Sequence, residues 1–158
     1  MLEFEHLVQI NDPENGSITP LSRQQLWDGL LLRAKDPGKF NSGLSCRLDE
    51  ITQNSFIRYI RSGDTEFRER VSLTFQVKIE TVTAGDNQPI HAKSITSIEE
   101  PENDYLFVRF MYRRDLEDSK EGRLIGEHLK SAYVQVDVDA IALIRLLAED
   151  KLLEKKPN

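Results

Sequence analysis

The C-terminal segment is the part of this sequence that most limits its possible folds. From about Leu124 to Lys155 the chain contains no proline and repeats its apolar residues with the period of an α-helix. Such a helix would be about 48 Å long at 1.5 Å per residue. Its apolar residues fall within about 60° of one line, which predicts one buried face. This stripe comprises Ile125, Leu129, Ala132, Tyr133, Val136, Ala140, Leu143, Ile144 and Leu147.

Two polar side chains lie on or beside this stripe. Tyr133 is its only member with a hydroxyl group, and Asp137 lies one turn further on, about 80° from the centre of the stripe. Tyr133 is either a ligand contact in a mostly apolar pocket or a core tyrosine bonded to a backbone carbonyl. Asp137 is either a pocket acid or a solvated residue on the flank of the helix.

Before this segment, apolar residues mostly alternate with a period of two, which is typical of β-strands. A strand over residues 67–80 would be about 46 Å long, so we expect an interruption near Gln76. The short connections predict an antiparallel sheet. The sequence does not decide which face of the last strand, residues 105–114, points inward, because apolar residues occupy both its even and its odd positions. The predicted strands are residues 4–10, 44–49, 56–61, 67–80, 90–98 and 105–114, with 99–104 as a turn.

A shorter amphipathic helix is predicted at about residues 21–35. Thr19 or Ser22 can cap its start, and Ser22 and Gln25 have the spacing of a capping box, in which each side chain accepts a hydrogen bond from the backbone of the other residue. Pro20 suits the beginning of a helix, and the sequence Asp36-Pro37-Gly38 predicts its end.

Glu69 occupies an unusual position for a charged residue. It falls on the apolar face of its strand, together with Val71 and Leu73, where an unpaired charge would cost several kcal/mol by order of magnitude. A two-residue hairpin loop at Gly63-Asp64 would place Arg58 directly opposite Glu69. We therefore predict that these two charges form a pair, either a structural ion pair or one that contacts a ligand.

Composition narrows the function classes. The chain has 158 residues, 39% of them hydrophobic, which fits a single domain spanning 1–158. A net charge of −6 without a basic cluster argues against a nucleic-acid partner. The first residues lack the pattern of a secretory signal, and no apolar run is long enough to span or insert into a membrane. We expect a cytoplasmic monomer or homodimer.

No catalytic or metal-binding motif is present. The three histidines are widely separated, so neither a metal nor another cofactor is expected. His6 shares a face with Phe4 and Val8, which favours a hydrogen-bonded core residue over a catalytic base. Cys46, the only cysteine, alternates with Leu44 and Leu48 and is interpreted as a small buried apolar residue.

Five stretches give the chain a family resemblance. They are FEHLVQIND (4–12), LSRQQLWDGLLLRAKDP (21–37), ERV (69–71), LFVRFMY (106–112) and EHLKSAYVQVDVDAI (127–141). Together these stretches resemble the AtaL-like branch of the START and Bet v 1 (pathogenesis-related class 10, SRPBCC) superfamily.

The resemblance implies an α+β helix-grip fold. In this fold a curved antiparallel sheet of about seven strands wraps around the long C-terminal helix, and two short helices follow the first strand. An elongated apolar cavity lies between the sheet and the helix. Relatives bind sterols, lipids, polyketides or other hydrophobic molecules, and a minority catalyse cyclisation or hydrolysis.

The predicted function is binding of a small hydrophobic molecule, lipid-, polyketide- or sterol-like, in that cavity. One alternative is an enzyme of cyclase or hydrolase type in which Glu69 or Asp137 acts as general acid or base. Another is a protein-interaction domain with a collapsed cavity. The catalytic residues, if any, are unknown. The candidate ligand contacts are Tyr133, Arg58, Glu69, Asp137, Phe56, Val71, Leu73, Phe110, Leu129, Val136 and Ala140.

Overall fold

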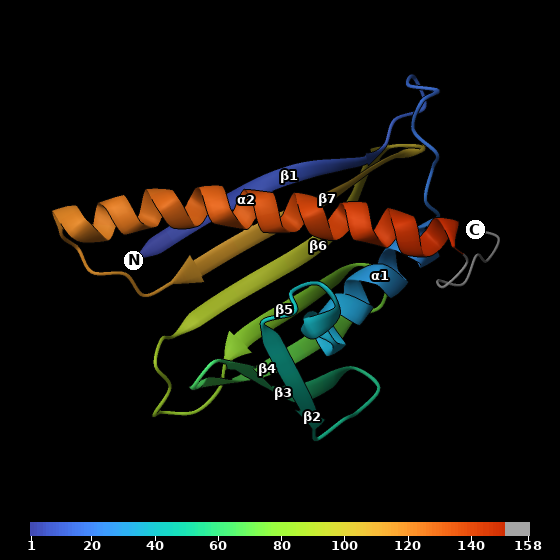
Figure 1. The fold of residues 1–158 in the computed structure, drawn as a ribbon. Coiled ribbons are helices and arrows are strands. Elements are labelled where there is room, and N and C mark those ends of the chain that lie inside the picture. Colours follow the sequence, from blue (N-terminus) through green and yellow to red (C-terminus); the bar gives the residue numbers. More distant parts are fainter. Residues whose placement is uncertain (151–158) are drawn as a thin grey trace.

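The computed structural model describes residues 1–150 and contains seven strands, two α-helices and one 3₁₀ turn within that range (Figure 1). In chain order these are β1 (Leu2–Asn11), α1 (Arg23–Lys35), η1 (Pro37–Lys39), β2 (Leu44–Asp49), β3 (Ser55–Ser62), β4 (Thr65–Thr74), β5 (Lys78–Thr83), β6 (Ala92–Glu102), β7 (Tyr105–Arg114) and α2 (Lys120–Glu149).

The strands form one antiparallel sheet in the order β1-β7-β6-β5-β4-β3-β2. Strands β2 to β7 each lie beside the next strand in the chain, because short connections join them. β1 pairs instead with β7. In Figure 1 the sheet curves around α1, η1 and α2, which lie on one of its faces. The predicted α+β arrangement of a curved seven-stranded sheet and a long C-terminal helix is confirmed.

The strand predicted at residues 67–80 is divided at the expected place. β4 ends at Thr74 and β5 begins at Lys78, and Gln76 between them has a positive φ of 57°. The start of α1 holds this turn, since Arg23 Nη1 donates to the Gln76 carbonyl at 2.8 Å and Gln76 Nε2 donates to Gln24 Oε1 at 2.6 Å. The interruption predicted near Gln76 is confirmed.

The end of β6 differs from the prediction. Residues 99–104 were expected to form a turn, but β6 continues to Glu102 through a register shift between Glu99 and Glu102. Only Asn103 and Asp104 connect it to β7, and Asp104 has a positive φ of 71°. The bulge accommodates Pro101, which cannot donate a ladder hydrogen bond.

The inward face of β7, which the sequence leaves open, consists of its even-numbered residues. Val108 and Phe110 are buried, whereas Arg109 lies on the outer face and bonds to Glu99. The register with β1 places His6 beside Phe110, so His6 also faces the helices.

Of the two predicted caps, Thr19 and Ser22, it is Ser22 that caps the start of α1. Its hydroxyl accepts a hydrogen bond from Gln25 N at 3.0 Å, and Gln25 Oε1 accepts one from Ser22 N at 2.9 Å, which completes the capping box. Further along α1, Gly29 lies against Ile144 of α2, and a Cβ atom at Gly29 would stand only 2.5 Å from Ile144 Cγ2. The absence of a side chain at Gly29 therefore permits the close approach of the two helices.

α2 begins at Lys120, before its predicted start at Leu124, because Ser119 accepts a capping hydrogen bond from Gly122 N at 3.0 Å. Lys120 and Glu121 lie outside the apolar stripe, so the stripe alone does not indicate this first turn. The helix is described to Glu149; residues 151–155 of the predicted helix lie outside the described residues.

The buried face of α2 differs from the predicted stripe. Its centre lies about 60° away at 100° per residue. As a result Ile125 and Val136 are 51% and 50% exposed, and Asp137, predicted to lie on the flank, is completely buried. The physical reason is that the face of α2 turned to the sheet contains Gly126, which has no side chain, and Asp137, which bonds to side chains of β1 and β7. The apolar flank of α2 therefore does not pack fully against the core. The buried residues are Gly122, Gly126, Asp137, Ala140, Ile141 and Ile144.

Candidate functional site

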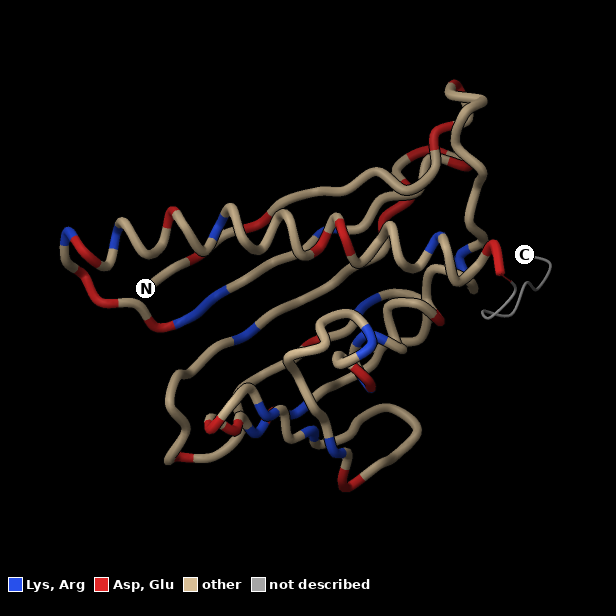
Figure 2. The backbone as a smooth tube through the Cα atoms, in the orientation of Figure 1, with Lys and Arg blue, Asp and Glu red and all other residues tan. Residues whose placement is uncertain are grey.

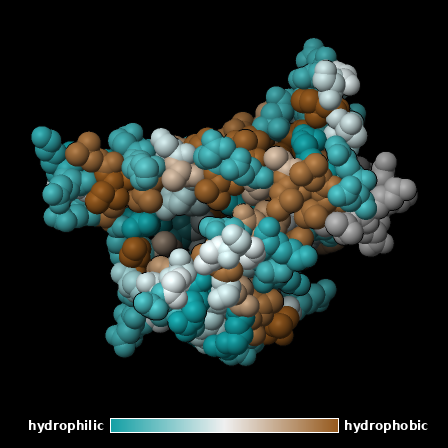
Figure 3. All heavy atoms as spheres, in the orientation of Figure 1, coloured by the Kyte–Doolittle hydropathy of each residue, from teal (hydrophilic) through white to brown (hydrophobic). Residues whose placement is uncertain are grey.

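A cavity of about 240 Å³ lies between the inner face of the sheet and the helical segments. α1, η1 and the chain after η1 form one side, strands β3 and β5 to β7 form another, and Val136 of α2 closes a third. In the space-filling view the surface is hollowed below α2 (Figure 3). Its apolar lining residues are Leu30, Ala34, Pro37, Phe40, Leu44, Ile60, Ile79 and Val136.

A larger groove of about 390 Å³ crosses the outer face of β1, β6 and β7. Side chains of both charge signs line it, including Glu3, Glu5, Lys93 and Arg113. Mixed charges of this kind are typical of a solvated surface, whereas ligand pockets are mostly apolar with a few placed polar groups. We therefore take the inner cavity as the candidate site.

The predicted Arg58–Glu69 pair is present on the inner face. The two residues are directly opposite in the β3–β4 hairpin, and Arg58 Nε donates to Glu69 Oε1 at 2.8 Å. Arg58 Nη1 also donates to the carbonyl of Ala34 in α1 at 2.8 Å. The side chains are only 15% and 18% exposed. Arg58 therefore ties the hairpin to the C-terminal end of α1, where a cation also complements the helix dipole.

Asp137 forms the centre of a second polar cluster. Tyr112 donates its hydroxyl hydrogen to Asp137 Oδ2 at 2.5 Å, and His6 Nε2 lies 2.7 Å from the same oxygen. Because a carboxylate only accepts hydrogen bonds, His6 carries its proton on Nε2. Arg33 of α1 adds a cation, with Nη2 2.9 Å from Oδ1. The cluster therefore joins β1, β7, α1 and α2.

The Arg33–Asp137 contact is an ion pair without an aligned hydrogen bond. Although 2.9 Å separates the two atoms, no N–H group within residues 1–150 points at Asp137 Oδ1. The Arg33 guanidinium lies 5.9 Å from the ring centre of Phe110. Its N–H groups are therefore available to another acceptor.

Aromatic rings surround the Asp137 carboxylate. Tyr133 stacks on Tyr112 with 4.1 Å between ring centres, and His6 stacks on Phe110 at 5.1 Å. Burial raises the pKa of the Tyr112 hydroxyl above its ordinary value of 10.0, and the Asp137 carboxylate raises it further. Tyr112 thus remains a hydrogen-bond donor at neutral pH.

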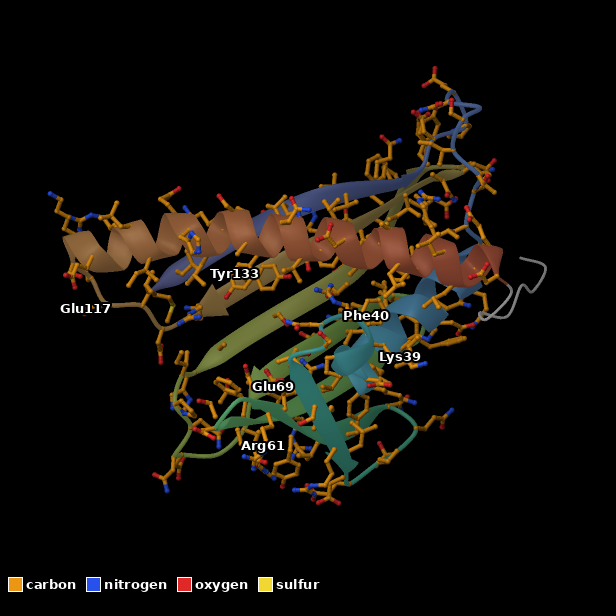
Figure 4. The ribbon with its side chains drawn as sticks, in the orientation of Figure 1. Lys39, Phe40, Arg61, Glu69, Glu117 and Tyr133 are labelled. Carbon is orange, nitrogen blue, oxygen red and sulfur yellow. The ribbon has the colours of Figure 1, made fainter. Side chains whose placement is uncertain are left out.

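The predicted site residues lie in three different environments. Only Arg58 and Val136 line the cavity; Glu69 is bonded to Arg58, while Asp137 and Tyr133 flank Tyr112. Figure 4 shows Tyr133 projecting from α2 toward the sheet and Glu69 on β4. Leu129 is half-buried on α2. The remaining residues belong to the packed interior, with Leu73 partly buried: Phe56, Val71, Leu73, Phe110 and Ala140.

Sequence reasoning missed Arg33 and Tyr112, and it assigned His6 no partner. A basic residue in the last turn of a helix is common, so Arg33 carries no local signal. Tyr112 lies on the same face of β7 as Phe110. If the sequence had shown that this face points inward, Tyr112 would have been a candidate site residue. The predicted role of His6 as a hydrogen-bonded inward residue agrees with its contact to Asp137.

Cys46 is half-buried, and burial raises the pKa of its thiol above the ordinary value of 9.0, which disfavours the nucleophilic thiolate. Among residues 1–150, no three His, Cys, Asp or Glu side chains are grouped so as to hold a metal ion. None of the helices in the described range has the length and apolar character required to span a membrane.

Solved structures share this fold at low sequence identity. The aromatase/cyclase Zhui from Streptomyces sp. R1128 is 12% identical with a TM-score of 0.62, covering 96% of each chain. A START superfamily protein from Mycobacterium smegmatis is 8% identical with a TM-score of 0.64, covering 93% of this chain and 99% of its own.

The di-domain aromatase/cyclase StfQ of the steffimycin biosynthetic pathway has a TM-score of 0.69 at 10% identity; 96% of this chain aligns with 51% of StfQ. A comparison with curated protein sequences finds no match. The sequence model for "Acetylaranotin biosynthesis cluster protein L" (AtaL) matches residues 8–151. With this match over most of its length and the START-like helix-grip architecture, the chain belongs to the AtaL family.

Proposed function

We propose that this protein binds a small hydrophobic molecule in the cavity between the sheet, α1 and α2. The observation that carries the proposal is the environment of Val136, which is 50% exposed on the apolar flank of α2 and forms part of the cavity wall. Leu30 and Phe40 contribute apolar surface from other sides of the cavity. A ligand that covers such surface gains about 25 cal/mol per Å².

The cavity volume favours a compact ligand. At about 30 Å³ for each molecule in the liquid, 240 Å³ corresponds to about eight waters. That space suits a molecule of one or two rings or a short chain. Three hydroxyl groups in the lining, from Thr81, Ser94 and Thr96, offer neutral polar contacts that can orient it.

The relatives support a role in small-molecule binding or conversion. The family description refers to a biosynthesis cluster, and two of the similar structures are described as aromatase/cyclases. Conversion of the ligand is the second candidate function. It is favoured by the buried Asp137 beside His6 and by Glu69 beside Arg58, which are potential acid–base groups close to the cavity.

The binding proposal is tested by filling the cavity. Ser94 on β6 lines the cavity, while Ser97 of the same strand faces the other side of the sheet, next to Arg109. We expect Ser94→Phe to weaken binding of the two-ring fluorescent probe 1-naphthylamine, which is neutral at pH 7, by about tenfold, because the new ring occupies the ligand space. Ser97→Phe should retain the wild-type affinity. Equal affinity of wild type and Ser94→Phe would contradict the proposal.

Native mass spectrometry of the purified protein would then identify a retained ligand. A molecule recovered unchanged after incubation indicates a binding protein. Turnover by the wild type that is lost in Glu69→Gln or Asp137→Asn indicates an enzyme. A protein that retains no ligand and binds no apolar probe would instead favour an interaction domain.

A further inference from the structure

The charged groups that line the cavity are of one sign. Arg33 and Arg58 contribute to its wall, and no Asp or Glu among residues 1–150 does so. This bias is notable in a chain with 27 acidic and only 21 basic residues. Basic residues lie at the C-terminal end of α1 and along β3 and β4 in Figure 2. The charged side chains in the cavity wall are thus basic, although the chain as a whole is acidic.

Both guanidinium groups have unused donors. Arg58 uses Nε for Glu69 and Nη1 for the Ala34 carbonyl, which leaves Nη2 without a hydrogen bond among the described residues. None of the five N–H groups of Arg33 makes a hydrogen bond within residues 1–150. Their side chains are only 22% and 15% exposed. Within residues 1–150 none of these nitrogens is a buried atom without a partner, so the free N–H groups reach water in the open cavity and can bind another acceptor in its place.

The nearby carboxylates do not supply that acceptor. Asp137 Oδ2 is shared by His6 and Tyr112, and Oδ1 is not aligned with any Arg33 N–H. Glu69 accepts a single bond from Arg58 Nε. Both carboxylates partly balance the charges of the arginines, but only the two arginines, and neither Asp137 nor Glu69, line the cavity.

We propose that the ligand is a hydrophobic acid: an apolar body of one or two rings that carries a carboxylate or an acidic phenol or enol group. Its oxygens accept hydrogen bonds from Arg33 and Arg58, and its apolar body lies against Leu30, Phe40 and Val136. Guanidinium is suited to this role, since it stays charged and its planar donors match a carboxylate. This inference rests on the proposed function and specifies its ligand class.

The test compares two probes of nearly equal shape, 2-naphthoate and its neutral analogue 2-naphthamide. Isothermal titration of the full chain at neutral pH should show 2-naphthoate binding about tenfold more tightly. The preference should largely disappear in Arg33→Gln/Asp137→Asn and in Arg58→Gln/Glu69→Gln. Each double variant removes a whole ion pair, so it leaves no buried charge without its partner.

The matched control is Arg61→Gln/Glu66→Gln. This pair joins the same two strands at 3.2 Å but lies exposed near the end of the hairpin, so its removal should leave the preference for 2-naphthoate unchanged. Equal binding of the two probes to the wild type overturns the inference while the binding function stands. A preference that persists in both cavity variants also overturns it. Failure of both probes to bind the wild type contradicts the inference and the proposed function together.

Discussion

Asp137 is the residue on which the inner polar contacts depend most. Three side chains from three other elements converge on its carboxylate: His6 from β1, Arg33 from α1 and Tyr112 from β7. Because the carboxylate is completely buried, water cannot replace it as an acceptor. Its removal would leave a cation and two polar groups without their partner in the interior.

We therefore expect Asp137→Ala to lower the free energy of unfolding by about 3 to 5 kcal/mol, the usual cost of breaking a buried charged cluster. Urea unfolding followed by circular dichroism measures this loss. Asp139→Ala is the control, because Asp139 is exposed on the same helix and bonds only to Gln135. Its unfolding free energy should stay within about 0.5 kcal/mol of the wild type. Equal stability of the two variants would show that the Asp137 cluster contributes nothing.

Tyr112 makes the free energy of unfolding depend on pH in the alkaline range. Its pKa is raised in the folded protein above the ordinary value of 10.0 by burial and by Asp137, so the folded state holds the hydroxyl proton more tightly than the unfolded state does. The contribution of the Tyr112 hydroxyl to the free energy of unfolding is therefore complete below pH 10.0, and it is lost as the pH rises further. In urea unfolding at a series of alkaline pH values, Tyr112→Phe should show a smaller decline than the wild type. Tyr105→Phe should follow the wild-type curve, since solvent screens its surface bond to Glu14.

Single residues differ in how well the sequence predicts their contacts. The pairing of Arg58 with Glu69 follows from a short hairpin whose loop sets the register, so local sequence is sufficient. The contacts of Asp137 depend on side chains far apart in the chain, the nearest of them Tyr112, which is 25 positions away. No local pattern specifies such a cluster, because the relative placement of two helices and two strands determines it.

Among the elements, α2 shows what hydrophobic periodicity can and cannot predict. The pattern correctly indicates a long amphipathic helix, but it assumes that the most apolar face is the most buried. Here the face that meets the sheet and α1 contains Gly126, Asp137 and Ala140, and the apolar stripe is turned partly away. The periodicity therefore predicts the position of the helix in the chain correctly but the buried face of the helix wrongly. Apolar residues can line a cavity as well as a core, so the most apolar face need not be the most buried one.

The crossing of α1 and α2 gives a prediction at this scale. In Gly29→Ala the new Cβ would collide with Ile144, which is completely buried. We expect a loss of about 1 to 3 kcal/mol in the free energy of unfolding, the usual cost of overpacking. Gly16→Ala is the control, because nothing lies within 4 Å of the added atom. A Gly29→Ala variant as stable as the control would mean that the helices are less closely packed.

For the whole molecule, most of the architecture could be predicted from local signals. Short connections order strands β2 to β7 one after another, and the turn at Gln76 fits the length limit on a single strand. The position of β1 beside β7 carries no such local signal and was not predicted. The prediction of the cavity depended on the family resemblance, because the cavity is space enclosed by distant segments rather than a property of any one of them.

The pairing of β1 with β7 also has a consequence for biosynthesis. Leu2 lies opposite Arg114, so β1 leaves the ribosome well before its neighbour β7 and can pair with it only after β2 to β6 have been translated. The hairpins between β2 and β7 can form earlier, but the interior remains open to chaperones or to ligand until α2 emerges. Closure of the cavity thus waits for α2, which follows all seven strands in the chain.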